Sequence, residues 1–334
     1  MITVAFCSYK GGSCRTTTCY NTLPFLARQL NATAHNPILV FDFDLDSMGL
    51  TNIFDQKMSL QDKKVRETYS ARNLFCEDDA RRVQDIKNLD NCESDYFEEN
   101  YNKIGNQLGL EDDKSVLFCG VYENSATITD EQYKQIESHS PLLNLIQSIS
   151  GFSDEDMPRA IVFDCASGIQ MTTLLALDYA DKVVMCLRPT VQARIGTLSY
   201  MRNRLPERFK KSMLGSQKRE VILLPTSVAG INVGLNEENR EEVIARLKKL
   251  RRKALLDINS SLIGGLKGYE REYGLPYSLN TEMIDPDENE MVGIPEVERF
   301  KWEEGLLYAM DNLTEQEKQL LKRYEKLSSI IAGE

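Results

Sequence analysis

The sequence is poor in the residues that build metal centres and covalent frameworks. Only two of its 334 residues are histidines, far apart, and its eight cysteines include no CxxC pair. This pattern excludes a zinc site of the usual spacing and a secreted disulfide framework. Cysteines within apolar, strand-like runs act as small core residues, so we expect a cytoplasmic, reducing compartment.

Long apolar runs and an excess of positive charge are also missing. No run approaches the roughly 18 apolar residues of a membrane helix, and the N-terminus leads into a strand pattern rather than a signal peptide. The 40 basic and 51 acidic residues give a net charge of −11, which argues against broad nonspecific attraction to nucleic acid or anionic lipid. A composition of 42% hydrophobic and 27% charged residues is ordinary for a globular protein.

The first 30 residues carry the pattern that organises the rest. Residues 2–7 are an apolar, β-branched run typical of a buried strand, and residues 16–30 have apolar side chains at helical spacing. Between them, Gly11 and Gly12 allow the backbone to wrap around phosphate, and a helix N-terminus attracts anions. Arg15 adds positive charge, and Thr16 offers a hydroxyl to a phosphate-bound Mg²⁺.

The standard P-loop pattern, Gly-x-x-x-x-Gly-Lys-Ser/Thr, fits this loop poorly. Tyr9, Cys14 and Arg15 stand at three of its four fixed positions. Residues 10–17, KGGSCRTT, instead resemble the deviant Walker A motif, Lys-Gly-Gly-x-x-Lys-Thr/Ser, of the ParA/MinD family of dimerising ATPases. The plainer alternative is a Gly-Gly turn between a strand and a helix, with incidental charges.

The resemblance implies a role for each residue of the loop. Lys10 corresponds to the signature lysine that reaches across a dimer interface to the partner's nucleotide, and Arg15 takes the place of the P-loop lysine. Thr16 corresponds to the magnesium ligand and Thr17 to a phosphate contact. By the same resemblance, the loop residues that bind ATP are Gly11, Gly12, Ser13, Cys14, Arg15, Thr16 and Thr17.

An acidic pattern follows the next apolar strand. Asp42, Asp44 and Asp46 alternate, so in an extended chain all three would face one side and repel one another unless a cation lay nearby. The stretch resembles the family's second motif, although Ser-Met replaces the usual Pro-Gln after the last aspartate. The resemblance implies that Asp46 positions or activates the attacking water and that Asp44 organises the magnesium shell. The alternative is an acidic strand end capped by solvent.

Residues 160–168 combine an apolar strand, an aspartate and a small-residue turn, as a Walker B strand requires. In that role, Asp164 holds a magnesium-bound water near the γ-phosphate. A helix and a strand at residues 182–187 follow in the order of the ParA/MinD family, but Ala166 and Ser167 replace the usual prolines. On its own, Asp164 would be an ordinary strand-end carboxylate.

Two prolines farther along the chain resemble segments beside the base in such ATPases. Pro225 lies in a strand predicted at residues 220–226, and Pro295 follows the apolar residues 291–294. The resemblance implies that both prolines border the purine, with adenine favoured.

The order of elements predicts an α/β fold: a three-layer, doubly wound, mostly parallel sheet of the P-loop NTPase type, in one domain spanning residues 1–334. Residues 55–158 are too long for an ordinary connection, so we expect a largely helical insertion there. Within it, residues 116–120 read as a strand and residues 141–149 as a helix.

Two later helices bear on partners. Residues 236–258 predict a long helix with an apolar stripe, and its segment Arg246–Lys253 is the densest basic run. DNA or an acidic partner is one reading of that run, but the absence of an aromatic residue favours a solvated face. Residues 314–331 predict an amphipathic helix opened by a Thr314–Glu317 capping box, and its mixed charges favour packing on its own domain over membrane binding.

Three departures from the family pattern lower the expected turnover. Arg15 is broader and more directional than lysine, Cys14 places a Cβ in a crowded turn, and Pro24 should kink the first helix or shift its start. We therefore expect an ATPase switch with ATP and Mg²⁺ as cofactors, slow hydrolysis, ATP-dependent homodimers and a protein partner or activator. The alternative is an ATP-sensing scaffold that scarcely hydrolyses and recruits a protein or DNA. A kinase or ligase would need a second substrate pocket, for which the sequence offers no defining residues.

Overall fold

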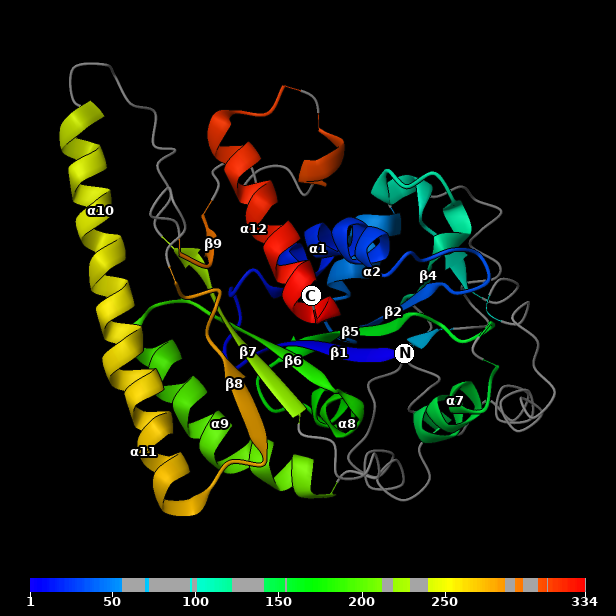
Figure 1. Cartoon of the computed structure of the whole chain (residues 1–334), viewed down its shortest axis with the longest axis horizontal. Helices are drawn as coiled ribbons and strands as arrows, with labels where there is room; N and C mark the ends of the chain where they lie inside the picture. The colour runs from blue at the N-terminus through cyan, green and yellow to red at the C-terminus, as the bar shows by residue number, and fades with distance from the viewer. Residues whose placement is uncertain are drawn as a thin grey trace. The chain divides into compact units, whose positions relative to one another are not determined.

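The fold is known from a computed structural model that describes residues 1–55, 70–71, 97, 101–121, 141–153, 155–211, 219–228, 240–285, 292–296, 306–310 and 312–333. It is the three-layer α/β fold of P-loop NTPases, with a mostly parallel sheet and flanking helices (Figure 1). The chain divides into two compact units. The first unit holds Met1–Thr3 and Leu23–Ala166, and the second holds Val4–Thr22 and Ser167–Glu334.

In the first unit, β2 lies between β4 and β5 and runs parallel to both, and β3 pairs antiparallel with β4. Every residue of β2 is buried, as expected for a parallel strand covered on both faces. The rings of Phe43 and Phe163 stack with centroids 4.8 Å apart and form part of the core. The elements are β2 (Ile38–Phe43), α2 (Gly49–Asp55), β3 (Asn102–Lys103), β4 (Val116–Cys119), α7 (Pro141–Ser150) and β5 (Ala160–Ser167).

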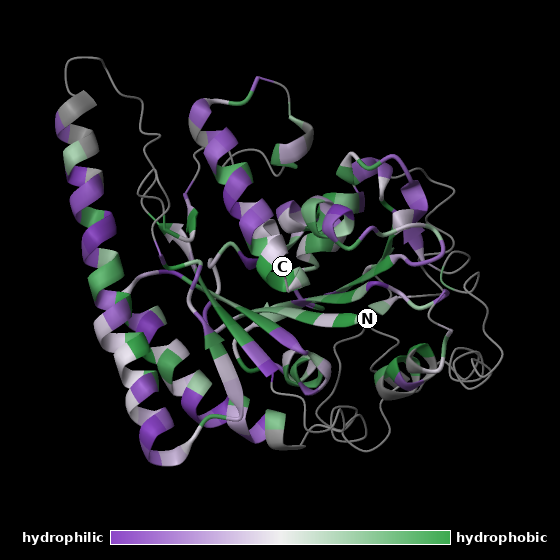
Figure 2. Cartoon of the chain, viewed as in Figure 1, coloured by the Kyte–Doolittle hydropathy of each residue, from purple (hydrophilic) through white to green (hydrophobic). Residues whose placement is uncertain are grey.

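In the second unit, four parallel strands are ordered β1-β6-β7-β8, and the short β9 pairs with the end of β7. Figure 1 shows α12 on one side of these strands and α8 and α9 on the other, and Figure 2 shows that β1, β6 and β7 are mainly hydrophobic. The strands are β1 (Ile2–Ser8), β6 (Lys182–Leu187), β7 (Arg219–Val228), β8 (Tyr277–Asn280) and β9 (Ile294–Pro295). The helices are α8 (Met171–Tyr179), α9 (Val191–Lys211), α10 (Arg240–Asp257), α11 (Gly264–Tyr273) and α12 (Glu315–Ala332).

Helix α1 (Arg15–Gln29) connects the two units through its own length. It begins at Arg15 and continues past Pro24, so the expectation that Pro24 shifts the start of the helix is wrong. A proline removes one N–H donor, and the remaining bonds of a 15-residue helix are sufficient to continue it.

The interval 55–158 contributes strand β4 and helix α7 at the positions predicted from the sequence. Strand β4 pairs with β2 and therefore belongs to the sheet. Most of the remaining interval lies outside the described residues, so a largely helical insertion and a single domain over the whole chain stay predictions.

Helix α10 continues through a π-helical segment, Ile258–Ile263, into α11. Figure 2 shows α10 as mainly hydrophilic. Leu250 is 47% exposed, whereas Ile258 is buried, so the predicted apolar stripe is not buried along its whole length. The described side chains reach the core only from Arg251 onward, because the helix packs at its C-terminal end.

Helix α12 confirms the predicted capping box. Thr314 N donates to Glu317 Oε2 at 2.8 Å, and Glu317 N donates to Thr314 Oγ1 at 3.3 Å. The apolar face of the helix is buried in the fold, as expected for packing on its own domain; its buried members are Leu320, Tyr324, Leu327, Ile330 and Ile331. Among the described residues, no helix has the length and apolarity needed to cross a membrane.

Candidate nucleotide site

The predicted phosphate loop connects β1 to α1 in the second unit. The Cys14 carbonyl accepts hydrogen bonds from Thr18 N at 2.9 Å and Thr18 Oγ1 at 2.6 Å, and Ser13 Oγ donates to the Lys10 carbonyl at 2.7 Å. These bonds hold both ends of the turn. Because α1 begins at Arg15, the N-terminus of the helix opens directly onto the loop, where N–H groups of a first turn can bind an anion.

The backbone of the loop forms an open cradle. Gly12 has φ of +73°, and a Cβ at this position would meet no atom within 4 Å. Cys14 has φ of +49°, in the left-handed region that disfavours residues with a side chain. The glycine that stands here in the standard P-loop would carry no such strain.

Arg15 is in contact with the predicted magnesium ligand. Only 7% of its surface is exposed, and Nη2 donates to Thr16 Oγ1 at 3.2 Å. The guanidinium therefore engages the hydroxyl that a nucleotide-bound metal would use. A lysine, with a compact ammonium group and no planar fork, would engage it differently.

Lys10 lies where the phosphate loop meets α9. Its Nζ donates to Gln192 Oε1 at 2.7 Å, and the Tyr9 ring lies so close to Gly196 that a Cβ on this glycine would overlap the ring. Val191 and Ile195, on the same first turns of α9, are 60% and 62% exposed. We call Tyr9, Lys10, Ile169, Val191 and Ile195, all exposed, the Lys10 rim.

The small-residue turn after β5 lies against the phosphate loop within the second unit. Gly168 N donates to the Ser8 carbonyl at 2.9 Å, and a Cβ on Gly11 would lie 3.6 Å from Ser167 Oγ. Gly168 has φ of +86°, a conformation that glycine adopts without strain. The turn predicted to follow the Walker B aspartate is therefore a direct neighbour of the predicted phosphate loop.

Pro225 and Pro295 lie on paired strands, β7 and β9. In this pairing Thr226 is opposite Ile294, and Val228 is opposite Pro295. Gly293, just before β9, has φ of +56°, and a Cβ on it would overlap the Pro225 carbonyl oxygen. We call residues 225–228 and 293–295 the β7–β9 end.

The β7–β9 end adjoins the phosphate loop. Ser227 has φ of +50°, and its Oγ lies 3.0 Å from Cys14 Sγ. The neighbouring Thr226 is fully buried, and its Oγ1 has no hydrogen-bond partner among the described residues. A buried hydroxyl without a partner is unfavourable unless something else satisfies it, as a bound ligand or water can.

The first unit carries a pair of buried carboxylates. The register of β2 and β5 places Asp42 opposite Asp164, and both residues are fully buried. The pKa of Asp42 is raised to about 7, first by burial and then by the charge of Asp164, against hydrogen bonds from Thr51 and the Asp44 N–H that lower it. Thr51 N and Oγ1 donate to Asp42 Oδ2 at 2.9 and 2.8 Å.

The prediction that Asp42, Asp44 and Asp46 all face one side of an extended strand is wrong, because the strand ends before Asp44. Strand β2 ends at Phe43, and Asp44 Oδ1 accepts from Ser47 N at 3.2 Å and Ser47 Oγ at 2.8 Å. This local turn ends the extended conformation, because an aspartate that bonds the backbone a few residues later favours a turn over a strand. Asp46 is exposed in that turn.

The predicted ligands, a threonine hydroxyl and aspartate carboxylates, are oxygen donors of the type that a nucleotide-bound magnesium ion takes. Such an ion takes much of its shell from phosphate and water, so the protein needs to supply only a few oxygens. Among the described residues, no group of three His, Cys, Asp or Glu side chains could hold a metal ion. The Asp42–Asp164 pair nevertheless brings two carboxylates together out of water, and a divalent cation would relieve their repulsion.

No family model matches the sequence, and no curated protein matches it. Solved structures do. An ATP complex of a Cyanothece McdA variant is 13% identical with a TM-score of 0.55, over 100% of this chain and 96% of that one. A chain of the MinC:MinD cell division complex of Aquifex aeolicus is 15% identical with a TM-score of 0.52, over 100% and 97%. The structure of pNOB8 ParA is 14% identical with a TM-score of 0.52, over 99% and 96%. The chain has the fold of the ParA/MinD-like P-loop ATPases.

Within this ParA/MinD-like fold, the predicted site residues form one set in each unit. The second unit holds Lys10, Gly11, Gly12, Ser13, Cys14, Arg15, Thr16, Thr17, Pro225 and Pro295. The first unit holds Asp44, Asp46 and Asp164. Contacts join the phosphate loop to the β7–β9 end in one set and place Asp164 beside the β2 strand in the other.

Sequence reasoning missed three residues of these sets. Asp42 was noted only as part of an alternating acidic pattern, and its pairing with Asp164 follows from the register of the two strands. Gln192 and Ser227 left none, because they contact Lys10 and Cys14 across 182 and 213 positions of the chain. Contacts of that range follow from the fold and not from a local motif.

Proposed function

We propose that this chain is a ParA/MinD-type ATPase switch, which binds ATP with Mg²⁺, dimerises in the nucleotide-bound state and hydrolyses ATP slowly to control a protein partner. The observation that carries the proposal is the place of the KGGSCRTT segment, between β1 and the start of α1 in a ParA/MinD-like fold. Gly11 and Gly12 bring the backbone close to phosphate, and the N-terminus of α1 with Arg15 offsets its negative charge.

The carboxylates of the first unit complete the proposed chemistry. When bound, Mg-ATP supplies the transferable γ-phosphoryl group and part of the charge neutralisation that its transfer to water requires. Asp164 and Asp44 would hold the waters around a bound metal, and Thr16 would offer its hydroxyl to it. Asp46, exposed in the turn after β2, orients the attacking water and accepts its proton.

The Lys10 rim supports the proposed dimer. Four large apolar side chains are exposed around one lysine, on the face that carries the phosphate loop. Burying such a patch against a second copy is favourable at about 25 cal/mol per Å². Lys10 would exchange its bond to Gln192 for the nucleotide of the partner subunit, so ATP in both sites would hold the two copies together.

A protein partner is favoured over DNA. The MinC:MinD complex of Aquifex aeolicus is an example of this fold bound to another protein. On α10 the described basic residues of Arg246–Lys253 are exposed except Arg251, so we treat the run as a solvated face. We place the protein in the cytoplasm, where its nucleotide would be supplied.

One observation favours a second function, an ATP-sensing dimeric scaffold with scarce turnover. Arg15 Nη2 is bonded to Thr16 Oγ1, so in this state the hydroxyl assigned to the metal is already engaged. A guanidinium that keeps this bond would allow nucleotide binding while it holds back alignment for hydrolysis.

Calorimetric titration with ATP and Mg²⁺, followed by a phosphate-release assay, tests the proposal. We expect the wild type to bind ATP and release phosphate slowly. Asp46→Ala should bind ATP with unchanged affinity and release phosphate about tenfold or more slowly. Asp285→Ala, which removes an exposed aspartate of the second unit, is the control and should behave as the wild type.

Three other outcomes of these assays would change the proposal. Unchanged turnover in Asp46→Ala removes this residue from the mechanism. ATP binding with dimerisation and no phosphate release favours the scaffold. A folded wild type that ignores millimolar ATP contradicts both functions.

A further inference from the structure

We infer that Arg323 of α12 is a positioning residue for nucleotide recognition: it fixes the β7–β9 end, whose prolines the resemblance to ParA/MinD ATPases implies lie beside the base. The inference rests on the proposed function. Arg323 is the largest of the fully buried side chains described, with 1% of its surface exposed. Burial of a guanidinium is costly unless its N–H groups find acceptors, so its acceptors indicate what it holds in place.

Those acceptors lie at the approach to β9. Arg323 Nε donates to the Gly293 carbonyl at 3.0 Å, and Nη2 donates to the Met283 carbonyl at 2.8 Å. The two carbonyl residues are joined in turn, because Gly293 N donates to the Met283 carbonyl at 2.7 Å. One buried guanidinium therefore bonds both Met283 and Gly293, the latter in the β7–β9 end.

The held glycine fits tightly against Pro225. A Cβ on Gly293 would overlap the Pro225 carbonyl oxygen and approach the Pro225 side chain, and Gly293 has φ of +56°. Gly293, packed this closely, cannot shift without moving Pro225. Arg323 therefore sets the position of Pro225 and, through the paired strand, that of Pro295.

The next residue of α12, Tyr324, lies within electrostatic range of the phosphate loop. Tyr324 is buried, and the pKa of its hydroxyl is raised first by burial and then by the neighbouring Cys14 and Cys186. Cys14 in turn lies 3.0 Å from Ser227 at the β7–β9 end. Arg323 thus bonds the segment before β9, and the neighbouring Tyr324 lies near Cys14, which is close to the same end.

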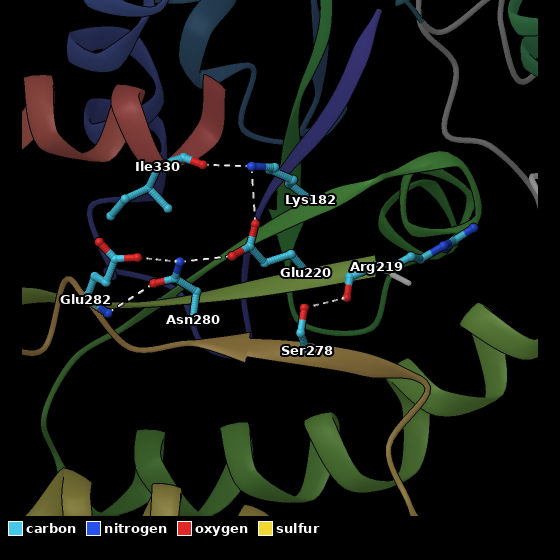
Figure 3. Close-up of polar contacts among 7 residues, drawn as sticks. All are labelled: Lys182, Arg219, Glu220, Ser278, Asn280, Glu282 and Ile330. Carbon is cyan, nitrogen blue, oxygen red and sulfur yellow. Dashed lines mark hydrogen bonds and ion pairs between the residues drawn. The ribbon is translucent and has the colours of Figure 1, made fainter. Parts of the chain in front are cut away.

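Both ends of the α12 region are anchored. Figure 3 shows Lys182 Nζ donating to the Ile330 carbonyl at 2.7 Å while it pairs with Glu220 Oε2 at 3.2 Å. At the other end, Leu307 N donates to Asn21 Oδ1 of α1 at 2.8 Å. These bonds hold the helix that carries Arg323 in place, as a positioning residue requires.

The chain offers a matched control in Arg219. It is also buried, and its Nη1 and Nη2 donate to the carbonyls of Leu177 and Asp178 at 2.6 and 2.8 Å. It is the first residue of β7, at the opposite end of the strand from Pro225, and Figure 3 shows its side chain pointing away from the Lys182–Glu220 pair. Its loss should affect stability through the same kind of bond without disturbing the β7–β9 end.

The test is the ratio of two affinities, for ATP and for inorganic tripolyphosphate, each with Mg²⁺. This ratio reports the base and ribose alone, because the phosphate loop contributes to both ligands. We expect Arg323→Met to lower the ratio by about tenfold, as for a misplaced binding group. Arg219→Met should leave the ratio unchanged at a similar loss of thermal stability. Arg323→Lys, which keeps the charge, should recover part of the ratio and remains informative if Arg323→Met does not fold.

The possible outcomes separate the inference from the proposed function. Equal ratios in the wild type and both Arg323 variants overturn the inference, as does an equal fall in Arg219→Met. A wild type that binds ATP and tripolyphosphate equally well also overturns it, because no base recognition then exists to be positioned. A wild type that binds neither ligand contradicts the proposed function itself.

Discussion

The phosphate loop and the carboxylate pair meet opposite physical demands. The loop is exposed and uses backbone geometry, with left-handed conformations at Gly12 and Cys14 that keep its N–H groups accessible. Asp42 and Asp164 are fully buried and lie close enough to raise the pKa of Asp42. The N-terminus of a helix favours an anion, whereas two buried carboxylates favour a cation.

The largest expected effect is on stability at the carboxylate pair. The pKa of Asp42 rises from 3.8 to about 7 on folding, so the folded state binds this proton more tightly than the unfolded state. The stabilising contribution is complete below about pH 4 and is lost as the pH rises through 7. Without Mg²⁺, the free energy of unfolding should fall between pH 5 and pH 8 by at most about 3 kcal/mol from this group.

Urea denaturation at the two pH values measures this loss. Asp42→Asn should show a smaller fall than the wild type, because the group no longer ionises. Asp112→Asn is the matched control in the same unit, since Asp112 also accepts backbone N–H bonds, from Ala34 and Lys114. Identical pH dependence in the wild type and Asp42→Asn would show that the pair is not strained.

The next effect is on turnover. Asp164→Asn keeps the shape of the side chain and removes the charge that would hold the waters around the metal. Phosphate release should fall about 100-fold, or about 3 kcal/mol in barrier, while ATP binding without Mg²⁺ is retained. If turnover in Asp164→Asn matched that of the wild type at every Mg²⁺ concentration, the carboxylate end would have no part in the chemistry.

A smaller effect should come from Arg15 in the phosphate loop. Arg15→Lys removes the bond to Thr16 Oγ1 and restores the group that the family motif carries. Phosphate release should rise several-fold, about 1 kcal/mol in barrier, because Thr16 is then available to the metal. Arg28→Lys, in the exposed last turn of the same helix, is the control. Reduced turnover in Arg15→Lys would show that the arginine assists hydrolysis rather than restrains it.

The smallest effect concerns the strain at Cys14. Cys14→Gly should relieve the left-handed conformation and stabilise the protein by about 1 kcal/mol, less the contact with Ser227 that is lost. Cys14→Ala loses the same contact and keeps the strain, so thermal denaturation of the two variants isolates the backbone term. If Ala were as stable as Gly, the loop would not be strained at this residue.

Local patterns predicted most of the fold. Apolar runs at β1, β2, β5, β6 and β7 mark parallel strands because both faces are buried, and the Thr314–Glu317 pair marks the start of α12 through its own hydrogen bonds. What the sequence could not indicate was the set of long-range neighbours. The contacts of Cys14 with Ser227 and of Arg323 with Gly293 depend on how strands and helices assemble.

The candidate site was predictable to the same extent. The glycine-bearing segment at residues 10–17 can be recognised from the sequence, because a phosphate loop is formed by one continuous stretch of backbone. The carboxylates were harder to assign, because the turn at Asp44 and Ser47 replaces the extended conformation on which the alternation argument relied. The buried Arg323 gave no signal at all, since an arginine on an amphipathic helix is ordinarily exposed.

The central claim is that residues 10–17 bind a magnesium nucleotide and thereby join two copies of the chain. Molar mass in solution, measured by light scattering with and without ATP and Mg²⁺, tests it most directly. The account predicts the mass of one 38.1 kDa chain without nucleotide and twice that mass with it. A mass that stays the same in saturating ATP and Mg²⁺ would contradict the claim.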